Sequence, residues 1–481
     1  MPIRLPGPFT IYALTVAGVF GILATARGLV DSDYYWHITA GRLVAERGVL
    51  ASDPFSYTWG GMPWVMHEWL GELLMFWLTT GIGVGAASFV FGVVSITGPL
   101  VLAWALRRHG VALLPLAVVT SLVVYLFASY ATIRPQAFSW LFLGLLLAGM
   151  VSIRPENRWL PWLAIPLFGV WANVHGLYVV GLGVLGVYVL FTVIGRTPLS
   201  PRRREMIGLL VAAVAASMLT PAGPEGLLYP LRYVDSGDWG LSHISEWQSP
   251  DFHDPAQIGL LGLIVAILAN GMRATPAWLA AMAVGGLVGA LLATRNVPLA
   301  GLLALPTLAL GAADRRSARD VPRPAHVQLA RRVMEIAAAL MVLTATAIVV
   351  PGLPAVAGHL VIPRTFPVAA VDRLAEIEPD ARVFAEYQWG GYVINQLHDR
   401  GARVFVDGRN DMYDEEILED FVAIRNAEED WERRLLAYGA DAILLPPVAP
   451  LVREARLGPE WCEAYRSDVA VLLVRNCPSQ P

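Results

Sequence analysis

The sequence has few charged residues, only two cysteines and no lysine. Charged residues make up 15% of its 481 residues, whereas 56% are hydrophobic, and all 35 basic residues are arginine. An ordinary soluble domain is about 25% charged, so this composition excludes a typical soluble protein and indicates a polytopic membrane protein. The net charge of −4 leaves no basic field, which gives no support to a nucleic-acid-binding class.

The two cysteines, Cys462 and Cys477, are too few for a disulfide framework, and no Cys/His spacing typical of a metal site occurs. They either form one disulfide outside the cytoplasm or remain thiols. The sequence also lacks a phosphate-binding glycine loop and a serine triad, and HEWLGE (67–72) is not the H-E-x-x-H motif of metalloproteases. The function therefore has to be sought in polar residues near the apolar segments.

Long apolar runs dominate the first 350 residues. A membrane helix needs roughly 20 apolar residues, and fewer where helices are buried among others. The first run is too long for the apolar core of a signal peptide, so we expect it to remain as an anchor. The runs predict about eleven transmembrane helices, at Pro8–Val30, Ile82–Leu106, Val111–Tyr130, Phe138–Val151, Leu160–Trp171, Leu177–Ile194, Ile207–Leu219, Ile258–Ala269, Ala277–Leu292, Val297–Leu310 and Ile336–Val350.

Arginine placement orients these spans, because cytoplasmic loops are enriched in basic residues. With Met1 in the cytoplasm, most arginines that flank the spans fall inside, and we therefore expect a prokaryotic inner-membrane protein with outer loops at 31–81 and 220–256. The run His67–Gly81 is too short to span and is predicted to lie on the outer surface as an amphipathic helix. The inside arginines are Arg4, Arg107, Arg108, Arg154, Arg158, Arg196, Arg202, Arg203, Arg204, Arg273, Arg315, Arg316, Arg319, Arg323, Arg331 and Arg332.

In this topology, the polar residues at the ends of the predicted spans all lie on the extracytoplasmic side of the membrane. Such groups are costly in a membrane unless they are paired or solvated in a cavity. We therefore predict a single extracytoplasmic cavity. Its candidate residues are Asp31, Asp33, His37, His67, Glu68, Arg134, Asn173, His175, Glu246 and Arg295.

Charged residues return toward the C-terminus, and residues 352–481 are predicted to form an extracytoplasmic α/β domain that follows a membrane domain at 1–351. Alternating strands and helices there predict a small, mostly parallel sheet. The expected strands are RVFAE, ARVFVDG, DAILLP and VAVLLVR, and the expected helices are PVAAVDRLAEI, DEEILEDFVAI and DWERRLLAYG.

The first outer loop, Asp31–Trp69, begins with DSDYYWHITAG. Asp31 and Asp33 are separated by one residue, which suits the binding of a divalent cation, and one of them also suits a base acting on an acceptor. The structural alternative is that Asp33 caps a helix running through His37. Both interpretations stay open from these residues alone.

The acidic pair, the aromatic residues and histidine after it, DPFSY (53–57) and the Pro-Trp before the surface helix together resemble the first outer loop of GT-C glycosyltransferases. The likeness is greatest to the catalytic subunit family of oligosaccharyltransferases. These membrane enzymes take sugars from polyprenyl-phosphate or polyprenyl-diphosphate carriers. The resemblance implies that Asp33, or Asp31 in its place, binds metal and lies beside the acceptor.

Two further segments match the same family in order. HISEWQSPDF (243–252) is similar to a family segment whose glutamate contacts the acceptor or metal, which carries that role onto Glu246. LLATRNVPLAGLLALP (291–306) resembles the segment whose arginine holds the lipid phosphate, and Arg295 is the counterpart. A guanidinium suits a bidentate phosphate contact. The alternative for Arg295 is an arginine whose charge simply reaches the membrane surface.

Residues 386–413 resemble the stretch around the Trp-Trp-Asp motif of the family's outer domain. Tyr387, Trp389, Asp407 and Arg409 are its candidate substrate-binding residues. The structural alternative is a tight WGGY turn together with a strand-end cap by Asp407. The carboxylate of the Trp-Trp-Asp motif has no counterpart here, so asparagine-linked glycosylation is not predicted.

The second outer loop, SYATIRPQAF (129–138), also departs from the family, because Arg134 and Gln136 stand where carboxylates are expected. The resemblance implies Mg²⁺ or Mn²⁺ at Asp33 and Glu246. The missing carboxylates favour instead a metal-independent site in which Arg134 supplies positive charge near a donor phosphate. Further candidate substrate contacts, each of which also suits a packed structural position, are His37, His67, Glu68 and His175.

The sequence therefore predicts a polytopic α-helical, GT-C-like glycosyltransferase. It would move a sugar from a polyprenyl-linked donor to an extracytoplasmic glycan, lipid or protein acceptor, with inversion. Asp33, Asp31 and Glu246 are the predicted catalytic residues, and Arg295 and Arg134 would neutralise the leaving phosphate. The alternative is a non-catalytic membrane protein of the same fold, either a lipid-linked sugar transporter or a scaffold.

Overall fold

The chain divides into two compact units, and neither is contiguous in sequence. The helical unit comprises Met1–Arg27, Leu78–Leu227 and Ser245–Leu360, whereas the mixed unit comprises Gly28–Trp77, Leu228–Ile244 and Val361–Pro481. The sequence-based division at 351/352 is contiguous, so it assigns the first outer loop differently. The computed structural model describes residues 7–154, 156–157, 159–229, 244–254, 257–270, 272, 275–317, 362, 364–409 and 412–475.

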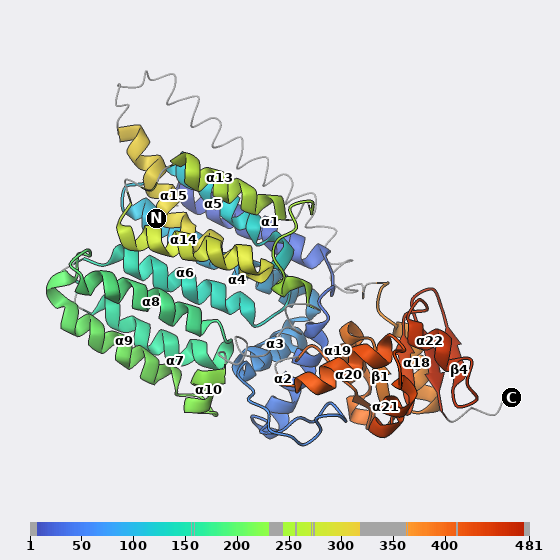
Figure 1. Cartoon of the computed structure of the whole chain (residues 1–481). Coiled ribbons are helices and arrows are strands. Elements are labelled where there is room, and N and C mark those ends of the chain that lie inside the picture. Colours follow the sequence, from blue (N-terminus) through green and yellow to red (C-terminus); the bar gives the residue numbers. More distant parts are fainter. Residues whose placement is uncertain are drawn as a thin grey trace. The chain divides into compact units, whose positions relative to one another are not determined.

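The helical unit is an assembly of apolar α-helices (Figure 1). Every predicted span from Pro8 to Leu310 overlaps one of these helices, and the last predicted span, 336–350, lies outside the described residues. Within those residues, α1 and α4 have the length and composition to cross a membrane, while seven other apolar helices are shorter. The total of about eleven spans stays a prediction. The helices are α1 (Pro8–Ala26), α4 (Val84–Arg108), α5 (Leu113–Leu126), α6 (Gln136–Ser152), α7 (Ala164–Val174), α8 (Tyr178–Val193), α9 (Arg203–Ser217), α10 (Pro224–Leu228), α13 (Ile258–Asn270), α14 (Ala277–Leu292) and α15 (Val297–Ser317).

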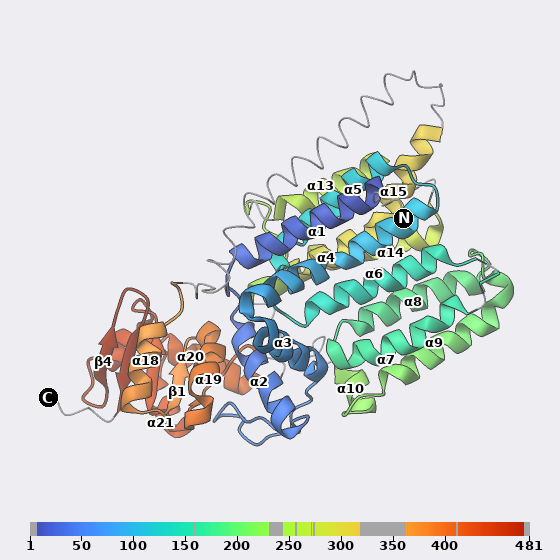
Figure 2. The ribbon, with the colours of Figure 1, turned by 180° about the vertical axis from the view of Figure 1, so that it is seen from behind.

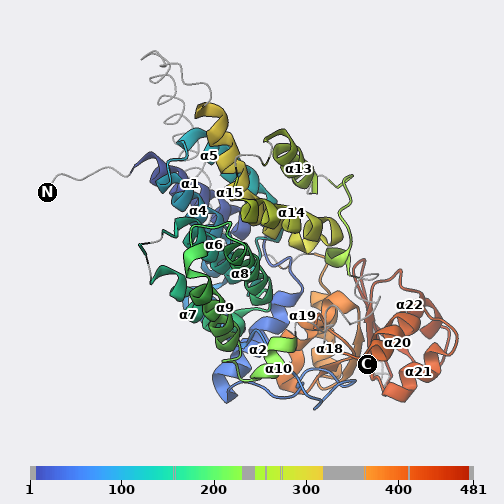
Figure 3. The same cartoon turned by 60° about the vertical axis from the view of Figure 1, so that its left-hand side comes forward.

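Small residues let the helices of this unit pack closely. α4 packs against α1 and α6, and α15 packs against α14 and α5. Figure 2 shows α1 running along α4, and Figure 3 shows α14 beside α15. At the crossing of α4 and α6, a Cβ built on Gly144 would lie 2.3 Å from the Cα of Gly98. A larger residue at either position would push the helices apart, which explains glycine at a close crossing of apolar helices.

The mixed unit is built on a five-stranded sheet with strand order β2-β1-β3-β5-β4. β1 pairs in parallel with β2 and β3, whereas β5 runs antiparallel to both β3 and β4. The expected mostly parallel sheet is therefore mixed. Its strands are β1 (Arg382–Ala385), β2 (Arg403–Val404), β3 (Ala442–Leu445), β4 (Cys462–Arg466) and β5 (Val471–Val474).

The three predicted helices of the C-terminal segment are present as α18 (Val368–Ile377), α20 (Glu415–Arg425) and α21 (Trp431–Tyr438). The sequence did not reveal strand β4 or the helices α19 (Gly390–Leu397) and α22 (Pro450–Ala455). β4 lies at the edge of the sheet and is only half-buried, so it lacks an apolar run. α19 begins with two glycines, which are poor helix formers. Cys462 begins β4, but Cys477 lies outside the described residues, so their pairing stays a prediction.

The first outer loop is part of the mixed unit. The N–H of Val404 donates to the carbonyl of Phe55 at 3.0 Å, and the N–H of Tyr57 donates to the carbonyl of Val404 at 3.0 Å. These bonds attach the loop in parallel to β2 through the bridge of Ser56 with Val404. The loop then leads to α3 (Trp69–Ile82), the helix predicted at 67–81, which belongs to this unit up to Trp77.

Helix α2 (Asp33–Arg47), which opens the same loop, packs on α19 (Figure 2). The approach is close, since a Cβ built on Gly391 would lie 2.8 Å from the carbonyl oxygen of Ser32. The WGGY segment is therefore a packing surface for α2, and its second glycine is explained by that contact. Two segments more than 300 residues apart in sequence thus share one core.

Candidate functional site

Two arginines flank one glutamate in the helical unit. Glu246 lies in a short 3₁₀ turn, Ser245–Trp247, and its Oε2 is 3.5 Å from Nη1 of Arg134, while its Oε1 is 3.7 Å from Nη1 of Arg295. The side chains of Arg134, Arg295 and Glu246 are 22%, 25% and 36% exposed. We call these three residues the Arg–Glu–Arg cluster. Its contacts are long for ion pairs and remain open to solvent.

Backbone hydrogen bonds hold the cluster in place. The N–H of Thr294 donates to the carbonyl of Gln248 at 3.0 Å, and the hydroxyl of Thr294 donates to the carbonyl of Glu246 at 3.1 Å. Tyr130 donates its hydroxyl to the carbonyl of Thr294 at 2.6 Å. These bonds dock the Glu246 turn on the 3₁₀ turn Thr294–Asn296 that carries Arg295. The cluster therefore brings together three loops that are distant in sequence.

The cluster carries more positive than negative charge. Burial by itself would raise the pKa of Glu246, but the charges of Arg134 and Arg295 lower it below its ordinary value. Glu246 is therefore a carboxylate at neutral pH, and the two guanidinium groups leave the cluster with one excess positive charge. The guanidinium of Arg295 also lies 4.6 Å from the centre of the Trp247 ring, a cation–π contact. Such a cluster suits an anion with several acceptor oxygens, such as a phosphate.

His175 and Asn173 end helix α7 in the same unit. Nδ1 of His175 lies 3.0 Å from Oγ of Ser139 at the start of α6. Asn173 donates its amide to the carbonyls of Gly169 and Leu219 at 2.8 and 2.9 Å, so it stabilises the helix end. His175 adds to the electrostatic environment that lowers the pKa of Glu246. Three of the ten predicted cavity residues, Arg134, Glu246 and Arg295, are therefore brought together by direct contacts.

Asp31 and Asp33 stand at the start of α2 in the mixed unit. The helix begins at Asp33 with Ser32 as its N-cap, and Oδ1 of Asp31 accepts a hydrogen bond from the N–H of Asp33 at 3.1 Å. The expected structural alternative, a cap by Asp33, is therefore wrong in detail, because Asp31 accepts that bond and Asp33 is the first helical residue. A Cβ built on Gly408 would lie 2.0 Å from Oδ1 of Asp33, so the carboxylate rests directly on the backbone after β2.

His37 lies one helical turn after Asp33 and is held between two carboxylates. Its Nδ1 is 3.1 Å from Oε1 of Glu72, and its Nε2 is 3.8 Å from Oε2 of Glu68. Nε2 of His67 is 3.4 Å from Oε1 of the same Glu68. Burial raises the pKa of Glu72 well above its ordinary value, and the charge of Glu68 adds to this shift. The predicted residues His37, His67 and Glu68 are thus neighbours, and Glu72 was missed because it lies within an apolar run.

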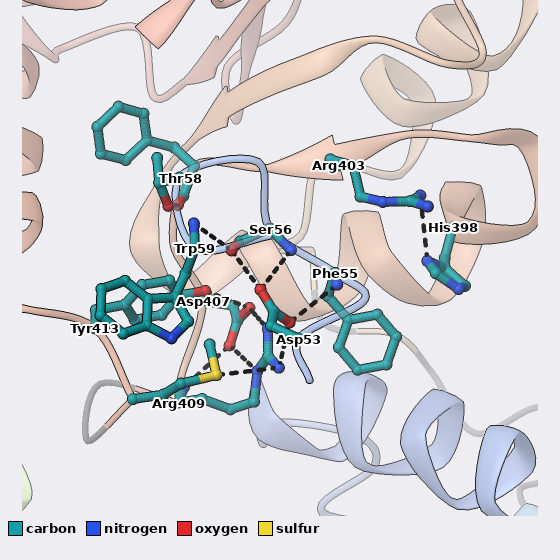
Figure 4. A network of polar contacts seen from close by, with 12 residues as sticks. Asp53, Phe55, Ser56, Thr58, Trp59, His398, Arg403, Asp407, Arg409 and Tyr413 are labelled. Atoms are coloured by element: carbon teal, nitrogen blue, oxygen red, sulfur yellow. Dashed lines mark hydrogen bonds and ion pairs between the residues drawn. The ribbon is translucent and has the colours of Figure 1, made fainter. Parts of the chain in front are cut away.

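Asp407 and Arg409 form a buried ion cluster with Asp53 (Figure 4). Figure 4 shows both carboxylates turned toward the guanidinium of Arg409, which lies 2.7 Å from Oδ1 of Asp53 and 2.6 Å from Oδ2 of Asp407. Tyr413 donates its hydroxyl to Asp407 at 2.8 Å. The side chains of Arg409, Asp53 and Asp407 are 2%, 0% and 0% exposed. We call these three residues the Asp–Arg–Asp cluster.

Aromatic rings enclose this second cluster. The guanidinium carbon of Arg409 is 4.8 Å from the ring centres of both Phe55 and Trp64, and 5.9 Å from that of Trp36. Because its donors and charges are already satisfied by protein groups, the geometry favours the structural alternative for Asp407 and Arg409 over substrate contact. Asp53 was not singled out in the sequence, although it opens the DPFSY segment that carried part of the resemblance.

Trp389 and Tyr387 lie at the end of β1. Trp389 is buried and donates its indole N–H to the carbonyl of Thr365 at 3.1 Å, which is a packing role. Tyr387 is half-buried, and its ring centre lies 6.2 Å from that of Phe421. Within the described part of the chain, no group of three or more His, Cys, Asp or Glu side chains is arranged to hold a metal ion. The Mg²⁺ or Mn²⁺ site at Asp33 and Glu246 stays a prediction.

No family model matches this sequence, and no curated protein is similar to it in sequence. Solved structures are nevertheless similar in fold. The archaeal oligosaccharyltransferase AglB from Archaeoglobus fulgidus, in complex with an inhibitory peptide and a dolichol-phosphate, has a TM-score of 0.58 at 11% identity and matches over 90% of this chain and 69% of that chain. ArnT from Cupriavidus metallidurans, bound to undecaprenyl phosphate, has a TM-score of 0.55 at 14% identity, with 97% of each chain covered. In the apo state, ArnT has a TM-score of 0.57 at 15% identity.

Both neighbours were solved with a lipid phosphate bound, dolichol-phosphate in AglB and undecaprenyl phosphate in ArnT. The chain therefore shares the fold of these proteins, which agrees with the polytopic α-helical class expected from the sequence, while the number of spans stays a prediction. At 11–15% identity the likeness concerns the fold alone. What the site does has to be argued from the residues of this chain.

Proposed function

We propose that this protein transfers a sugar from a polyprenyl-phosphate or polyprenyl-diphosphate donor to an extracytoplasmic acceptor. The single observation that carries the proposal is the Arg–Glu–Arg cluster, in a fold shared with two proteins that were crystallised with lipid phosphates. Two half-exposed guanidinium groups with one excess positive charge suit a phosphate whose negative charge increases as the sugar departs. The protein would lie in a prokaryotic inner membrane, with its N-terminus cytoplasmic and its mixed unit outside.

Each polar group has a defined part in this proposal. Arg295 and Arg134 bind the donor phosphate, and the weak contacts of Glu246 allow the phosphate to displace it. Asp33 positions or deprotonates the acceptor nucleophile, since it is half-buried at a helix start and rests on backbone that a larger residue would not permit. Glu246, once displaced, orients the acceptor or contacts a cation. Displacement in one step would invert the configuration at the sugar.

Asp33, the residue proposed to act on the acceptor, is held in place by rigid elements of the mixed unit. α2 carries Asp33 and packs on α19, while the Asp–Arg–Asp cluster ties the same loop to β2. A group that must accept a proton from a nucleophile needs its position fixed to within a fraction of an ångström. The buried cluster is therefore support for the site rather than part of its chemistry.

The test is a comparison of cell-envelope glycans and lipid-linked sugar pools in cells that carry the natural protein or its Asp33→Asn variant. We expect loss of one glycan modification and accumulation of its polyprenyl-linked donor in the variant, measured by mass spectrometry. Asp468→Asn, at an exposed aspartate of the same unit, is the matched control and should change neither. Unchanged glycans and donor pools in cells with stable Asp33→Asn protein would favour a transporter or scaffold instead.

A further inference from the structure

Most arginines of the mixed unit pair with carboxylates, and three that do not lie close together. From residue 373 to residue 475, every described arginine other than Arg400 and Arg403 lies within 4.0 Å of a carboxylate oxygen. Arg47, the last residue of α2, likewise has no ion pair within the described part of the chain. Because the other arginines are paired so consistently, these three indicate a place where charge is kept for a partner outside the chain.

The end of α2 lies against the 3₁₀ turn His398–Arg400. Nη2 of Arg42 lies 2.6 Å from Oδ1 of Asp399 in that turn, and Nη1 lies 3.0 Å from Oε1 of Glu46 on α2 itself. Arg47 follows Arg42 by little more than one helical turn. One arginine therefore engages both of these acids, and neither acid contacts Arg47.

His398 lies among the same arginines. Its Nδ1 accepts a hydrogen bond from Nη1 of Arg403 at 3.5 Å, and its ring centre is 5.0 Å from that of Phe55 (Figure 4). Burial of the imidazole, and then the positive charges of Arg403, Arg42 and Arg47, lower the pKa of His398 to about 4. The histidine is therefore neutral at neutral pH, and the positive charge at this place comes from guanidinium groups alone.

The hydrogen bonds of Arg400 and Arg403 fix their positions but leave their charge uncompensated. Nη1 of Arg403 donates to the carbonyls of Gly401 and Ala402 at 3.0 and 2.8 Å, and Nη1 of Arg400 donates to the carbonyl of Ala375 at 3.3 Å. Carbonyl groups accept these bonds without supplying a negative charge. The side chain of Arg403 is half-buried and that of Arg400 is exposed, so both can be reached from solvent.

We propose that Arg47, Arg400 and Arg403, here called the arginine patch, bind an acceptor glycan that bears carboxylate or phosphate groups. Guanidinium groups suit such anions, because their N–H donors match two oxygens at once. The inference rests on the proposed function, since it names the class of the acceptor. The shared chemistry is an anionic group with several oxygens, which inorganic phosphate also presents.

The place of the patch on α2 favours an extended acceptor over a small anion. The same helix begins with Asp33, the residue proposed to act on the acceptor, and ends with Arg47. At about 1.5 Å per residue, the two ends of this helix are roughly 20 Å apart. A molecule that reaches both ends has to be a chain of sugars, and its anionic groups away from the reacting sugar would lie at the patch.

The experiment measures binding of oligogalacturonate, which has a carboxylate on each sugar, to the purified full chain in phosphatidylcholine nanodiscs. A neutral malto-oligosaccharide of the same length is the comparison. We expect Arg47→Ala/Arg403→Ala to weaken oligogalacturonate binding about 3- to 30-fold, as for the loss of two partly screened charge contacts. Higher salt should reduce the affinity of the natural protein toward that of the variant.

The matched control is Arg373→Ala/Arg433→Ala, which removes the same charge at exposed arginines that already pair with Glu376 and Asp430. It should leave oligogalacturonate binding unchanged. Thermal unfolding checks that each variant is folded. Arg47→Ala alone keeps the test available if the double variant does not fold, because Arg47 has no ion pair to lose, and it should also weaken binding.

Tighter binding of the acidic than of the neutral oligosaccharide, with a loss specific to the patch variants, supports the inference. Equal binding of the two oligosaccharides, or an equal loss in the control, overturns it. Inorganic phosphate that binds as tightly as oligogalacturonate overturns the assignment to a glycan. Patch variants that lose affinity only for phosphatidylglycerol vesicles assign the patch to a membrane surface and overturn it too.

Failure of the proposed function has a different signature. In that case the natural protein would bind oligogalacturonate through the patch, while Asp33→Asn would leave cell-envelope glycans and donor pools unchanged. That combination overturns the assignment of the glycan as an acceptor. Altered glycans in Asp33→Asn cells, together with patch variants that bind oligogalacturonate normally, would instead overturn the patch and leave the proposed function standing.

Discussion

Each unit holds a cluster of arginine and carboxylate side chains, an arginine between two aspartates in the mixed unit and a glutamate between two arginines in the helical unit, and the geometry of the two clusters differs. In the mixed unit, Arg409 contacts Asp53 at 2.7 Å and Asp407 at 2.6 Å, and its side chain is 2% exposed. In the helical unit, Glu246 lies 3.5 and 3.7 Å from Arg134 and Arg295, and all three side chains are 22–36% exposed. Charged side chains of the same kinds are thus buried and tightly paired in the mixed unit, but partly exposed and loosely paired in the helical unit.

This difference separates a structural role from a binding role. A buried charge is costly unless it is paired and hydrogen-bonded, so the Asp–Arg–Asp cluster cannot exchange its partners without a large loss of stability. Solvent screens the longer contacts of the Arg–Glu–Arg cluster, and each such contact contributes little to stability. An incoming phosphate can therefore displace Glu246 there, whereas no ligand can displace Asp407. Residue type alone does not distinguish the two cases.

The largest effect is expected from Arg409→Leu. It leaves the carboxylates of Asp53 and Asp407 buried without their common partner, which costs about 3–5 kcal/mol of stability. The free energy of unfolding, or the thermal midpoint of the purified protein, measures it. Arg373→Ala, which breaks an exposed pair with Glu376, is the matched control and should cost less than about 1 kcal/mol. Equal losses for the two variants would contradict a structural role for the buried cluster.

Arg295→Ala should leave stability nearly unchanged and instead impair function. Loss of one donor to a developing oxyanion lowers rates by about 100- to 1,000-fold, so we expect that decrease in sugar transfer. Arg295→Lys keeps the charge but not the fork of donors and should recover part of the activity. Arg203→Ala, at an exposed arginine of the helical unit, is the control. A normal transfer rate in folded Arg295→Ala protein would remove this arginine from the site.

Glu246→Gln should have a smaller effect on donor binding, and in the opposite direction. Without the competing carboxylate, the two arginines should bind undecaprenyl phosphate about two- to fivefold more tightly, in keeping with a half-exposed charge pair. Transfer should fall nonetheless, since the acceptor loses an orienting group. Binding measured beside transfer separates the two effects. Weaker donor binding in this variant would indicate that Glu246 helps to hold the donor, for example through a cation.

The smallest effect is expected from the pH dependence of the buried cluster. Burial alone would raise the pKa of Asp53, but the charge of Arg409 and hydrogen bonds from Ser56 and Phe55 lower it below its ordinary value. A carboxylate whose pKa is depressed by folding stabilises the protein above its unfolded pKa, and this contribution is lost as pH falls through the folded pKa.

The stability difference between the natural protein and Asp53→Asn should therefore be greatest near neutral pH and should narrow below about pH 4. Thermal midpoints of both proteins across pH 7 to 3.5 test this. Asp468→Asn serves as the control, because the aspartate it replaces is exposed. A difference that stays constant over the whole range would mean that Asp53 acts through its shape and not its charge.

Much of the fold could be predicted because apolar periodicity and arginine placement are local properties of the chain. Every predicted span up to Leu310 overlaps a helix, and the three predicted helices of the C-terminal segment are present. The sheet was less predictable. β4 is half-buried and charged, and strand order depends on contacts between segments far apart in sequence. α19 was missed because its two glycines are determined by packing against α2.

The sequence identified candidate residues for the site, but it did not show which of them are buried or which contact one another. Arg134, Glu246 and Arg295 were identified from their place in the chain, and the structure groups them. Asp407 and Arg409 were also identified, yet they are buried with Asp53, which sequence reasoning did not single out. Glu72, which contacts His37, was missed because it lies within an apolar run.

The sequence by itself determined that the chain is apolar, helical and rich in arginine at loop ends, because these properties follow from composition and local periodicity. The tertiary structure decided which charges are buried and which remain open, because burial depends on residues brought together from distant segments. Only the tertiary structure therefore distinguishes an arginine that supports the fold from an arginine that can bind a ligand.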